Sequence, residues 1–269
     1  MAGSGSHLDF RDRDAQLRGL EAHCFDLLVI GGGITGAGIA RDAAMRGLTV
    51  ALIEARDFAS GTSSRSSKMI HGGLRYLANA EFGLVREAAS ERQRIRRIAP
   101  HLAQPCWYVL PSTSAGSTLK LRAALSLFDR LGDAASADRH WVAKPAALRD
   151  FEPAMRTEGL HRGLVYREYL TDDARLTLAN VRDAAAHGAA IASYLAAGSI
   201  AAEVGGISSI VCRSTLPGAD NECRIRARAV KGAPHLDRWI EAIRARPAYQ
   251  AAFPAFLALA RETLAAQKH

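Results

Sequence analysis

The clearest hydrophobic pattern in the chain runs from residue 25 to residue 54. The run FDLLVI, residues 25–30, is apolar almost throughout, which is typical of a central parallel strand buried on both faces. A glycine turn follows, and residues 34–46 then predict a helix that Gly47 ends. Residues 50–54 predict a second buried strand. The pattern therefore predicts a strand–helix–strand unit of the kind that binds dinucleotides.

Hydrophobic periodicity predicts further elements on either side of this unit. Residues 10–22 form a short amphipathic pattern with Phe10, Leu17 and Leu20 on one side, which predicts a helix beside the first strand. Residues 231–269 are rich in alanine and predict a helical tail. The other predicted elements are helices over residues 84–98, 119–131 and 174–187, and strands over residues 100–111, 189–195 and 224–230. Asp172 and Asp173 fit N-terminal capping of the helix over 174–187 better than they fit catalysis.

Three glycines after the first strand indicate nucleotide-binding chemistry. Gly31 lets the chain turn sharply, Gly33 lets a pyrophosphate approach the backbone, and Gly36 allows close contact between helix and strand. The helix would aim its N-terminal amides at that phosphate. Glu54, at the end of the second strand, would accept hydrogen bonds from ribose hydroxyls, although it could instead be an ordinary surface glutamate. The order of strand, GxGxxG, helix and acid favours dinucleotide binding over a purely structural glycine turn.

A segment rich in hydroxyl groups, glycines and bases follows the second strand. A simple nicotinamide-binding unit would pass directly into another helix, whereas this chain continues through GTSSRSSKMIHGGLRY, residues 61–76. Its glycines permit close backbone approach, its serines can bond phosphate and ribitol oxygens, and Lys68 and His71 can lie beside an anionic isoalloxazine. A flexible polar loop is the alternative, and the apolar Met69 and Ile70 argue against it. The segment therefore favours a flavin over a nicotinamide cofactor.

Composition and charge narrow the class of protein. The chain has 269 residues, of which 48% are hydrophobic and 23% charged, as expected of a globular protein with one large or two small domains. The formal net charge is +8, with a local cluster of Arg92, Arg94, Arg96 and Arg97. A solvated helix face, or a surface facing anionic lipid headgroups, explains this cluster better than nucleic-acid contact does, because no nucleic-acid motif accompanies it.

Cysteine usage and hydropathy predict the compartment. The four cysteines are widely spaced and form no CxxC pair, which predicts reduced thiols, and we expect no metal site. No apolar run reaches the length needed to span a bilayer, and the N-terminus has no apolar signal core. We therefore expect a cytoplasmic protein that could attach peripherally to the inner face of the cytoplasmic membrane.

Two stretches resemble the FAD-dependent glycerol-3-phosphate dehydrogenases, flavoproteins that pass electrons to quinone. IGGGITGAGIARDAAMRG, residues 30–47, is similar to that family's N-terminal signature, and SSRSSKMIHGGLRYL, residues 63–77, is similar to its next block. The resemblance continues through LSLFDRLG and YLTDDARLTLANVRDAAAHGAAIASY and fades near Val230. It implies an α/β, Rossmann-like FAD-binding fold of the glutathione-reductase type. The implied domain covers residues 25–230, with an N-terminal arm over 1–24 and part of a substrate region inserted at about 100–165.

The resemblance also implies an activity and a set of site residues. The activity is oxidation of sn-glycerol 3-phosphate to dihydroxyacetone phosphate. Arg75 and Tyr76 would be the first substrate contacts, since an arginine offers a charged fork for a phosphate monoester, although Arg75 could also be a salt-bridged surface residue. The ADP half of FAD would be held by Gly31, Gly33, Gly36 and Glu54, and the flavin would be lined by Thr62, Ser63, Ser66, Lys68, Met69, Ile70 and His71.

Beyond residue 230 the sequence departs from that family. An Asn-Ala-Thr-Gly-Pro-Trp-like turn that touches FAD is expected there, but the chain reads KGAPHLDRW, residues 231–239. The remaining substrate-domain sheets and a C-terminal glycine-lysine motif are also missing, and family members run to roughly twice this length. Residues 232–269 are instead faintly similar to the last helices of glutathione transferases.

These departures leave the catalytic residues and the activity open. The base that takes the substrate's hydroxyl proton is expected in the missing half, so no catalytic residue is assigned. One alternative is a truncated, non-catalytic FAD-binding remnant or interaction protein, and another is a nicotinamide-dependent dehydrogenase. Residues 61–76 speak against the nicotinamide alternative. The expected partners are the small-molecule substrate and quinone, with a homo-oligomer possible.

Overall fold

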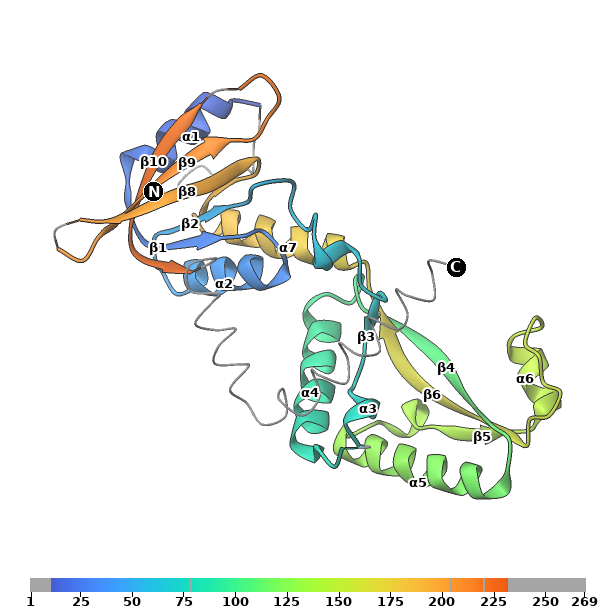
Figure 1. Cartoon of the computed structure of the whole chain (residues 1–269). Helices are drawn as coiled ribbons and strands as arrows, with labels where there is room; N and C mark the ends of the chain where they lie inside the picture. Colours follow the sequence, from blue (N-terminus) through green and yellow to red (C-terminus); the bar gives the residue numbers. More distant parts are fainter. Residues whose placement is uncertain (1–10, 78, 204, 220, 232–269) are drawn as a thin grey trace, which may run out of the picture. The chain divides into compact units, whose positions relative to one another are not determined.

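The computed structural model describes residues 11–77, 79–203, 205–219 and 221–231, which form two compact units (Figure 1). Unit 1 contains the described residues up to Ser60 and from Thr177 onward, and unit 2 contains Gly61–Leu176. Phe10 and residues 232–269 of the helical tail predicted over 231–269 lie outside the described residues, whereas Lys231 is the last residue of a strand rather than part of a helix.

Unit 1 is built on a sheet whose described strands follow the order β7-β2-β1-β10-β9-β8. Leu28 in the central strand pairs with Ala51 on one side and Val230 on the other. This pairing confirms the two predicted buried strands and the strand predicted over residues 224–230. The parallel strands are β7 (Ala190–Ala192), β2 (Val50–Ile53), β1 (Cys24–Ile30) and β10 (Glu222–Lys231), and the antiparallel extension is β9 (Ser208–Ser214) and β8 (Leu195–Ala202).

Helices cover both faces of this sheet, which explains why its central strands are apolar throughout. On one face α2 (Ile34–Met45) and α7 (Asp173–Ala186) pack through small residues such as Ala40 and Ala184. On the other face α1 (Arg13–Ala22) buries Leu17 and Leu20 in the same cluster as Leu28 (Figure 1). The short helix predicted beside the first strand is therefore confirmed.

Unit 2 is a smaller sheet covered by helices. Its described strands follow the order β3-β6-β4, and β5 also pairs with β6. The core contains Val85, Leu125, Phe128 and Tyr166. The strands are β3 (Met69–Ile70), β4 (Gln104–Ser112), β5 (Trp141–Ala143) and β6 (Arg162–Leu170). The α-helices are α3 (Leu74–Leu77), α4 (Phe82–Ile98), α5 (Ala115–Leu131) and α6 (Pro145–Phe151), and the 3-10 turns are Thr62–Ser64 and Ser136–Asp138.

Two boundaries in unit 2 differ from the predictions for local reasons. The helix predicted from residue 119 begins at Ala115, because Ser114 and Ser117 form a reciprocal capping box at its N-terminus. The strand predicted from residue 100 begins at Gln104, since the chain first makes a turn in which the Leu102 amide donates to the Ala99 carbonyl at 2.9 Å. The described residues include no helix that is long and apolar enough to cross a bilayer.

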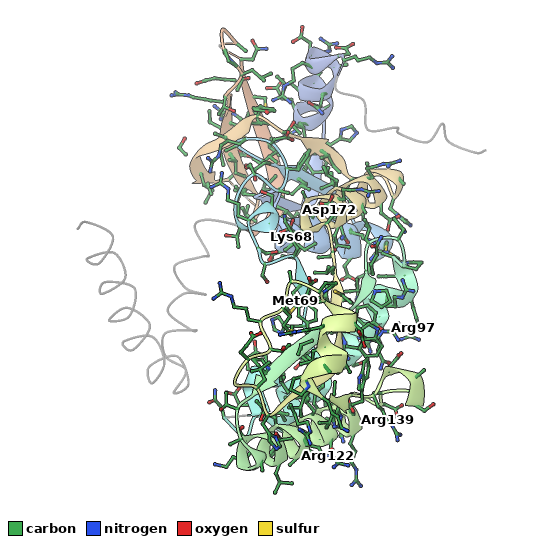
Figure 2. The ribbon with its side chains drawn as sticks, turned by 90° about the vertical axis from the view of Figure 1, so that its right-hand side faces the viewer. Lys68, Met69, Arg97, Arg122, Arg139 and Asp172 are labelled. Carbon is green, nitrogen blue, oxygen red and sulfur yellow. The ribbon has the colours of Figure 1, made fainter. Side chains whose placement is uncertain are left out.

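The arginine cluster of α4 does not form one solvated face as predicted. Arg94 and Arg97 are exposed, and Figure 2 shows Arg97 at the outside of unit 2. Arg96 is half-buried and donates to the carbonyl oxygens of Pro100 and Ala103 at 2.7 and 3.0 Å. Arg92 is only 8% exposed. The prediction is wrong for Arg92, because a buried acidic partner compensates for the loss of water around its charge.

Candidate functional site

The glycine turn after β1 brings the strand end and the start of α2 into close contact. Gly31 has φ of +110°, a conformation that strains any residue with a side chain. Its amide donates to the Ile53 carbonyl at 2.8 Å, which ties the turn to β2. A Cβ at Gly36 would lie 1.8 Å from the Gly31 carbonyl oxygen. The close approach of helix and strand that the sequence predicted at Gly36 is therefore present.

Gly32 is a further position in this turn that leaves no room for a side chain. A Cβ there would lie 2.4 Å from Phe58 Cδ1 and 2.9 Å from Glu54 Cβ. The Ala59 amide also donates to the Gly32 carbonyl at 3.1 Å. Sequence reasoning gave roles only to the other glycines of the turn, although three consecutive glycines were a signal for this one.

The helix α2 begins directly at the glycine turn. The N-cap residue is Gly33, and no side chain of the described residues caps the helix there. The first turn of α2 carries no acidic side chain, so nothing in that turn opposes an anion. The positive end of a helix dipole suits a pyrophosphate.

Glu54 follows the end of β2 and holds the glycine turn through its carboxylate. Its Oε2 accepts from the Gly32 amide at 2.7 Å, and its Oε1 accepts from the Arg56 amide at 2.8 Å. A carboxylate has about four acceptor positions, so both oxygens retain capacity for hydroxyl donors. Glu54 is therefore more than a surface acid at a strand end, and its geometry suits ribose binding at this turn.

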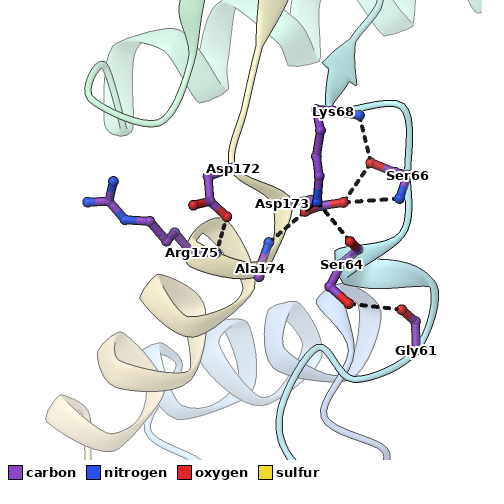
Figure 3. A network of polar contacts seen from close by, with 8 residues as sticks. All are labelled: Gly61, Ser64, Ser66, Lys68, Asp172, Asp173, Ala174 and Arg175. Carbon is purple, nitrogen blue, oxygen red and sulfur yellow. Dashed lines mark hydrogen bonds and ion pairs between the residues drawn. The ribbon is translucent and has the colours of Figure 1, made fainter.

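In unit 2 a polar network joins the serine-rich segment to the start of α7 (Figure 3). The Lys68 ammonium donates to the Ser64 carbonyl at 2.8 Å and pairs with the Asp173 carboxylate. The Ser66 hydroxyl donates to the same carboxylate at 2.7 Å and accepts from the Lys68 amide at 3.1 Å. Lys68 adopts φ of +61°, which this network supports. Both Ser66 and Lys68, predicted to line a flavin, therefore share Asp173 as a partner.

These contacts stabilise the ionised form of Asp173. Burial acts to raise its pKa, but the hydrogen bonds from Lys68 and Ser66 outweigh burial and lower the pKa to about 2. The neighbouring Asp172 accepts from the Arg175 amide at 3.0 Å, which confirms its predicted role as an N-terminal cap of α7. Asp173 was also predicted to cap the helix, but its link to Lys68 was not predicted, since the two residues are distant in sequence.

The His71–Gly73 turn connects β3 to α3. The Gly72 amide donates to both carboxylate oxygens of Glu168, at 3.1 and 2.9 Å. Gly73 has φ of +79°, and a Cβ there would lie 2.5 Å from the Tyr76 ring. His71 is exposed, with its ring centroid 6.2 Å from that of Tyr76. The turn thus exposes the His71 imidazole at the surface, while Glu168 binds the backbone amide of Gly72.

The predicted site residues fall into two groups, one in each unit. Unit 1 brings together the residues assigned to the ADP half, and unit 2 carries those assigned to the flavin and substrate. Arg75 lies on α3, and its side chain is outside the described part of the structure. The ADP group is Gly31, Gly33, Gly36 and Glu54, and the unit 2 group is Thr62, Ser63, Ser66, Lys68, Met69, Ile70, His71, Arg75 and Tyr76.

Comparison with known proteins places the fold and the glycine turn in one family. The family model described as FAD dependent oxidoreductase matches residues 26–245. The chain belongs to this family of FAD-dependent oxidoreductases. The predicted Rossmann-like α/β fold and the predicted cofactor, FAD, are confirmed at the level of the family.

Several relatives carry one more specific name. The aerobic glycerol-3-phosphate dehydrogenase of Staphylococcus epidermidis is 42% identical over 184 residues, which cover 68% of this chain and 33% of the relative. The same-named protein of Staphylococcus aureus is 45% identical over 172 residues, covering 63% and 31%. The chain thus spans about a third of the length of the curated relatives it matches.

A solved structure shows the same likeness. The glycerol-3-phosphate dehydrogenase from Bacillus halodurans, complexed with FAD, is 34% identical, with a TM-score of 0.64. The match covers 86% of this chain and 38% of that one. The resemblance to glycerol-3-phosphate dehydrogenases drawn from the sequence is therefore confirmed.

Proposed function

We propose that this chain is the FAD-binding part of an oxidoreductase that converts sn-glycerol 3-phosphate to dihydroxyacetone phosphate and passes electrons to quinone. The observation that carries the proposal is the glycine turn of unit 1. At Gly32 and Gly36 an added Cβ would meet neighbouring atoms within 3 Å, and the adjacent α2 N-terminus has no side-chain cap among the described residues. The specific substrate is supported by the 42% and 45% identity to aerobic glycerol-3-phosphate dehydrogenases.

The residues of the chain fit FAD in distinct ways. The amides at Gly33 and the first turn of α2 would bind the pyrophosphate, and Glu54 would accept from the ribose while its other contacts hold the turn. Thr62, Ser63 and Ser66 would supply hydroxyl contacts to the flavin half. The chemistry that FAD supplies when bound is acceptance of a hydride from the second carbon of the substrate.

Lys68 can serve the flavin without leaving Asp173. An ammonium group has three donors, and the contacts with Ser64 and Asp173 use two of them. Among the described residues no contact uses the third donor, which would serve an anionic flavin, with the short β3 pair Met69 and Ile70 as apolar neighbours in sequence. His71 would lie beside the ring from the exposed end of its turn.

Substrate contacts would come from α3. Arg75 would bind the phosphate through its guanidinium fork, and Tyr76 would supply a hydroxyl. The Tyr76 amide donates a hydrogen bond to the Gly73 carbonyl at 2.8 Å, and Gly73 packs closely against the Tyr76 ring. These two contacts hold Tyr76 in place. No residue of this chain is assigned as the base.

The proposal also covers the domain boundaries, the contact with the membrane and the oligomeric state. We place the FAD-binding domain at residues 25–230, with part of the substrate region at about 100–165. The net charge of +8 would support peripheral contact of the protein with the inner face of the cytoplasmic membrane. The proposed FAD-binding protein could also form a homo-oligomer.

A second function is FAD binding without turnover, because no base is assigned among the described residues. One experiment separates the two. The purified chain is incubated with FAD, its flavin absorption is measured after gel filtration, and reduction of an artificial dye is followed with glycerol 3-phosphate. Bound flavin with dye reduction supports the dehydrogenase, and bound flavin without it supports the second function. A colourless chain that takes up no FAD contradicts both, and flavin-free NADH-linked turnover would indicate a nicotinamide enzyme.

A further inference from the structure

A buried ion pair lies directly behind the His71–Gly73 turn in unit 2. The Arg92 guanidinium of α4 pairs with the Glu168 carboxylate of β6, and their side chains are 9% and 1% exposed. The guanidinium carbon also lies 5.5 and 5.4 Å from the ring centroids of Phe128 and Tyr169, and Arg92 donates to the Arg167 carbonyl at 3.3 Å. The terminal nitrogen Nη1 of Arg92 is therefore held by hydrogen bonds and the guanidinium plane by two aromatic rings, while Arg92 Nε makes no hydrogen bond within the described part of the chain.

The pair connects to the turn through one residue. Both oxygens of Glu168 accept from the Gly72 amide, and a Cβ at Gly72 would lie 2.6 Å from Phe128 Cζ and 2.9 Å from Arg92 Nη1. The backbone of the turn is therefore pressed against the ion pair, with no space for any other residue at position 72. His71 is the neighbour of this anchored amide and faces solvent.

Stability alone is a poor reason for this arrangement. Removing two charges from water is costly, and apolar residues of similar volume often stabilise a core as well as a buried pair does. An apolar residue at position 168 would leave the buried Gly72 amide without its acceptor. The basic groups near Glu168 are Arg92 and His71, and the hydroxyl groups of Tyr108 and Tyr166 also lie within electrostatic range of its carboxyl group. Burial raises the pKa of Glu168, and Arg92 opposes that effect.

We propose that Arg92 and Glu168 are positioning residues that hold the His71–Gly73 turn in the conformation that receives the flavin. This inference rests on the proposed function, because it deepens the role given to His71. Glu168 fixes the Gly72 amide, and Arg92 holds the Glu168 carboxylate in place through their ion pair. Neither side chain needs to touch the cofactor.

Two double variants separate positioning from stability. Arg92→Met with Glu168→Gln removes both charges but keeps a carbonyl acceptor for the Gly72 amide. Arg92→Met with Glu168→Leu removes both charges and the acceptor. Each folded chain is compared with wild type by thermal unfolding, by hydrogen exchange of the Gly72 amide in the absence of FAD, and by FAD affinity from quenching of flavin fluorescence.

The two variants should have similar unfolding temperatures but should differ in the exchange rate of the Gly72 amide and in their affinity for FAD. In the leucine variant we expect the Gly72 amide to exchange about tenfold faster and FAD to bind about tenfold more weakly, as for one lost buried hydrogen bond. The glutamine variant should stay within about threefold of wild type on both readouts. Equal FAD affinity in both variants, with a faster-exchanging amide in the leucine variant, would overturn the positioning role.

Two further outcomes are also decisive. If the wild-type chain binds no FAD, the proposed function fails, and amide exchange alone then decides whether the pair anchors the turn. If the double variants do not fold, Glu168→Asp replaces them, because it keeps the charge and withdraws the carboxylate by one methylene group. Unchanged FAD affinity and unchanged Gly72 exchange in Glu168→Asp would overturn the inference.

Discussion

The Lys68 ammonium is paired with the Asp173 carboxylate across 105 residues of sequence. The pair joins the segment predicted to line a flavin to the first turn of α7 within unit 2. Asp173 is nearly buried and Lys68 is partly exposed, with side-chain exposures of 12% and 45%. The contact therefore fixes the backbone of the serine-rich segment while leaving part of the lysine accessible.

Asp173→Asn should destabilise the protein in a pH-dependent way. The folded pKa of Asp173, about 2, lies below its ordinary value of 3.8. The ionised form is thus favoured by folding, so its stabilisation is fully present above pH 4 and is lost as the pH falls toward 2. Allowing for screening of the partly exposed Lys68, we expect a loss of about 1 kcal/mol at pH 7 and almost none near pH 2, measured by urea unfolding.

Asp172→Asn provides the matched control. Asparagine caps helix N-termini about as well as aspartate, and the acceptor for the Arg175 amide remains. Its free energy of unfolding should stay close to that of wild type at both pH values. A loss in Asp173→Asn that does not change with pH would show that the Lys68 pair is not its cause.

Gly36→Ala should prevent the glycine turn from forming, whereas Gly38→Ala in the same helix should not. The new Cβ at position 36 would lie 1.8 Å from the Gly31 carbonyl, while nothing lies within 4 Å of a Cβ at position 38. Gly38→Ala should stabilise the helix by about 0.5–1 kcal/mol, because alanine is the better helix former. Thermal unfolding and FAD binding of both variants check this, and equal behaviour would mean that the turn is not tightly packed.

Cys212 and Cys223 should resist alkylation in the folded protein. They face each other across β9 and β10, and both are buried free thiols. Burial keeps the reagent away from both sulfur atoms, because Cys212 is 0% and Cys223 is 3% exposed. Iodoacetamide followed by peptide mass mapping should label the half-buried Cys24 and Cys106 first. Rapid labelling of Cys212 without urea would contradict the packing of these strands.

The sequence predicted the parts of the fold that depend on local pattern. The apolar run 25–30 lies in β1, and the helix predicted after the glycine turn is α2. Both were predictable because a strand buried on both faces and a helix that begins at a glycine turn have recognisable local sequence patterns. Asp172 and Asp173, at the start of α7, were correctly interpreted as N-terminal residues, since capping is set within one turn.

What the sequence did not reveal depends on contacts between distant segments. Arg92 was assigned to a solvated face because its neighbours are charged, and only the packing of α4 against β6 brings it to Glu168. Glu168 lies in the otherwise largely apolar strand GLVYREYL. A charged residue in such a strand indicates that it has a partner, but the sequence does not indicate which residue that partner is. Asp173 was not recognised as the partner of Lys68 for the same reason, because the two residues are 105 positions apart in the sequence.

Titration of the purified chain with FAD tests the central claim most directly. Flavin fluorescence should be quenched on binding and saturate at one FAD per chain, with affinity abolished in Gly36→Ala and kept in Gly38→Ala. This result would establish that the glycine turn binds the dinucleotide independently of any turnover. No quenching by a folded wild-type chain, or equal binding by Gly36→Ala, would contradict the account.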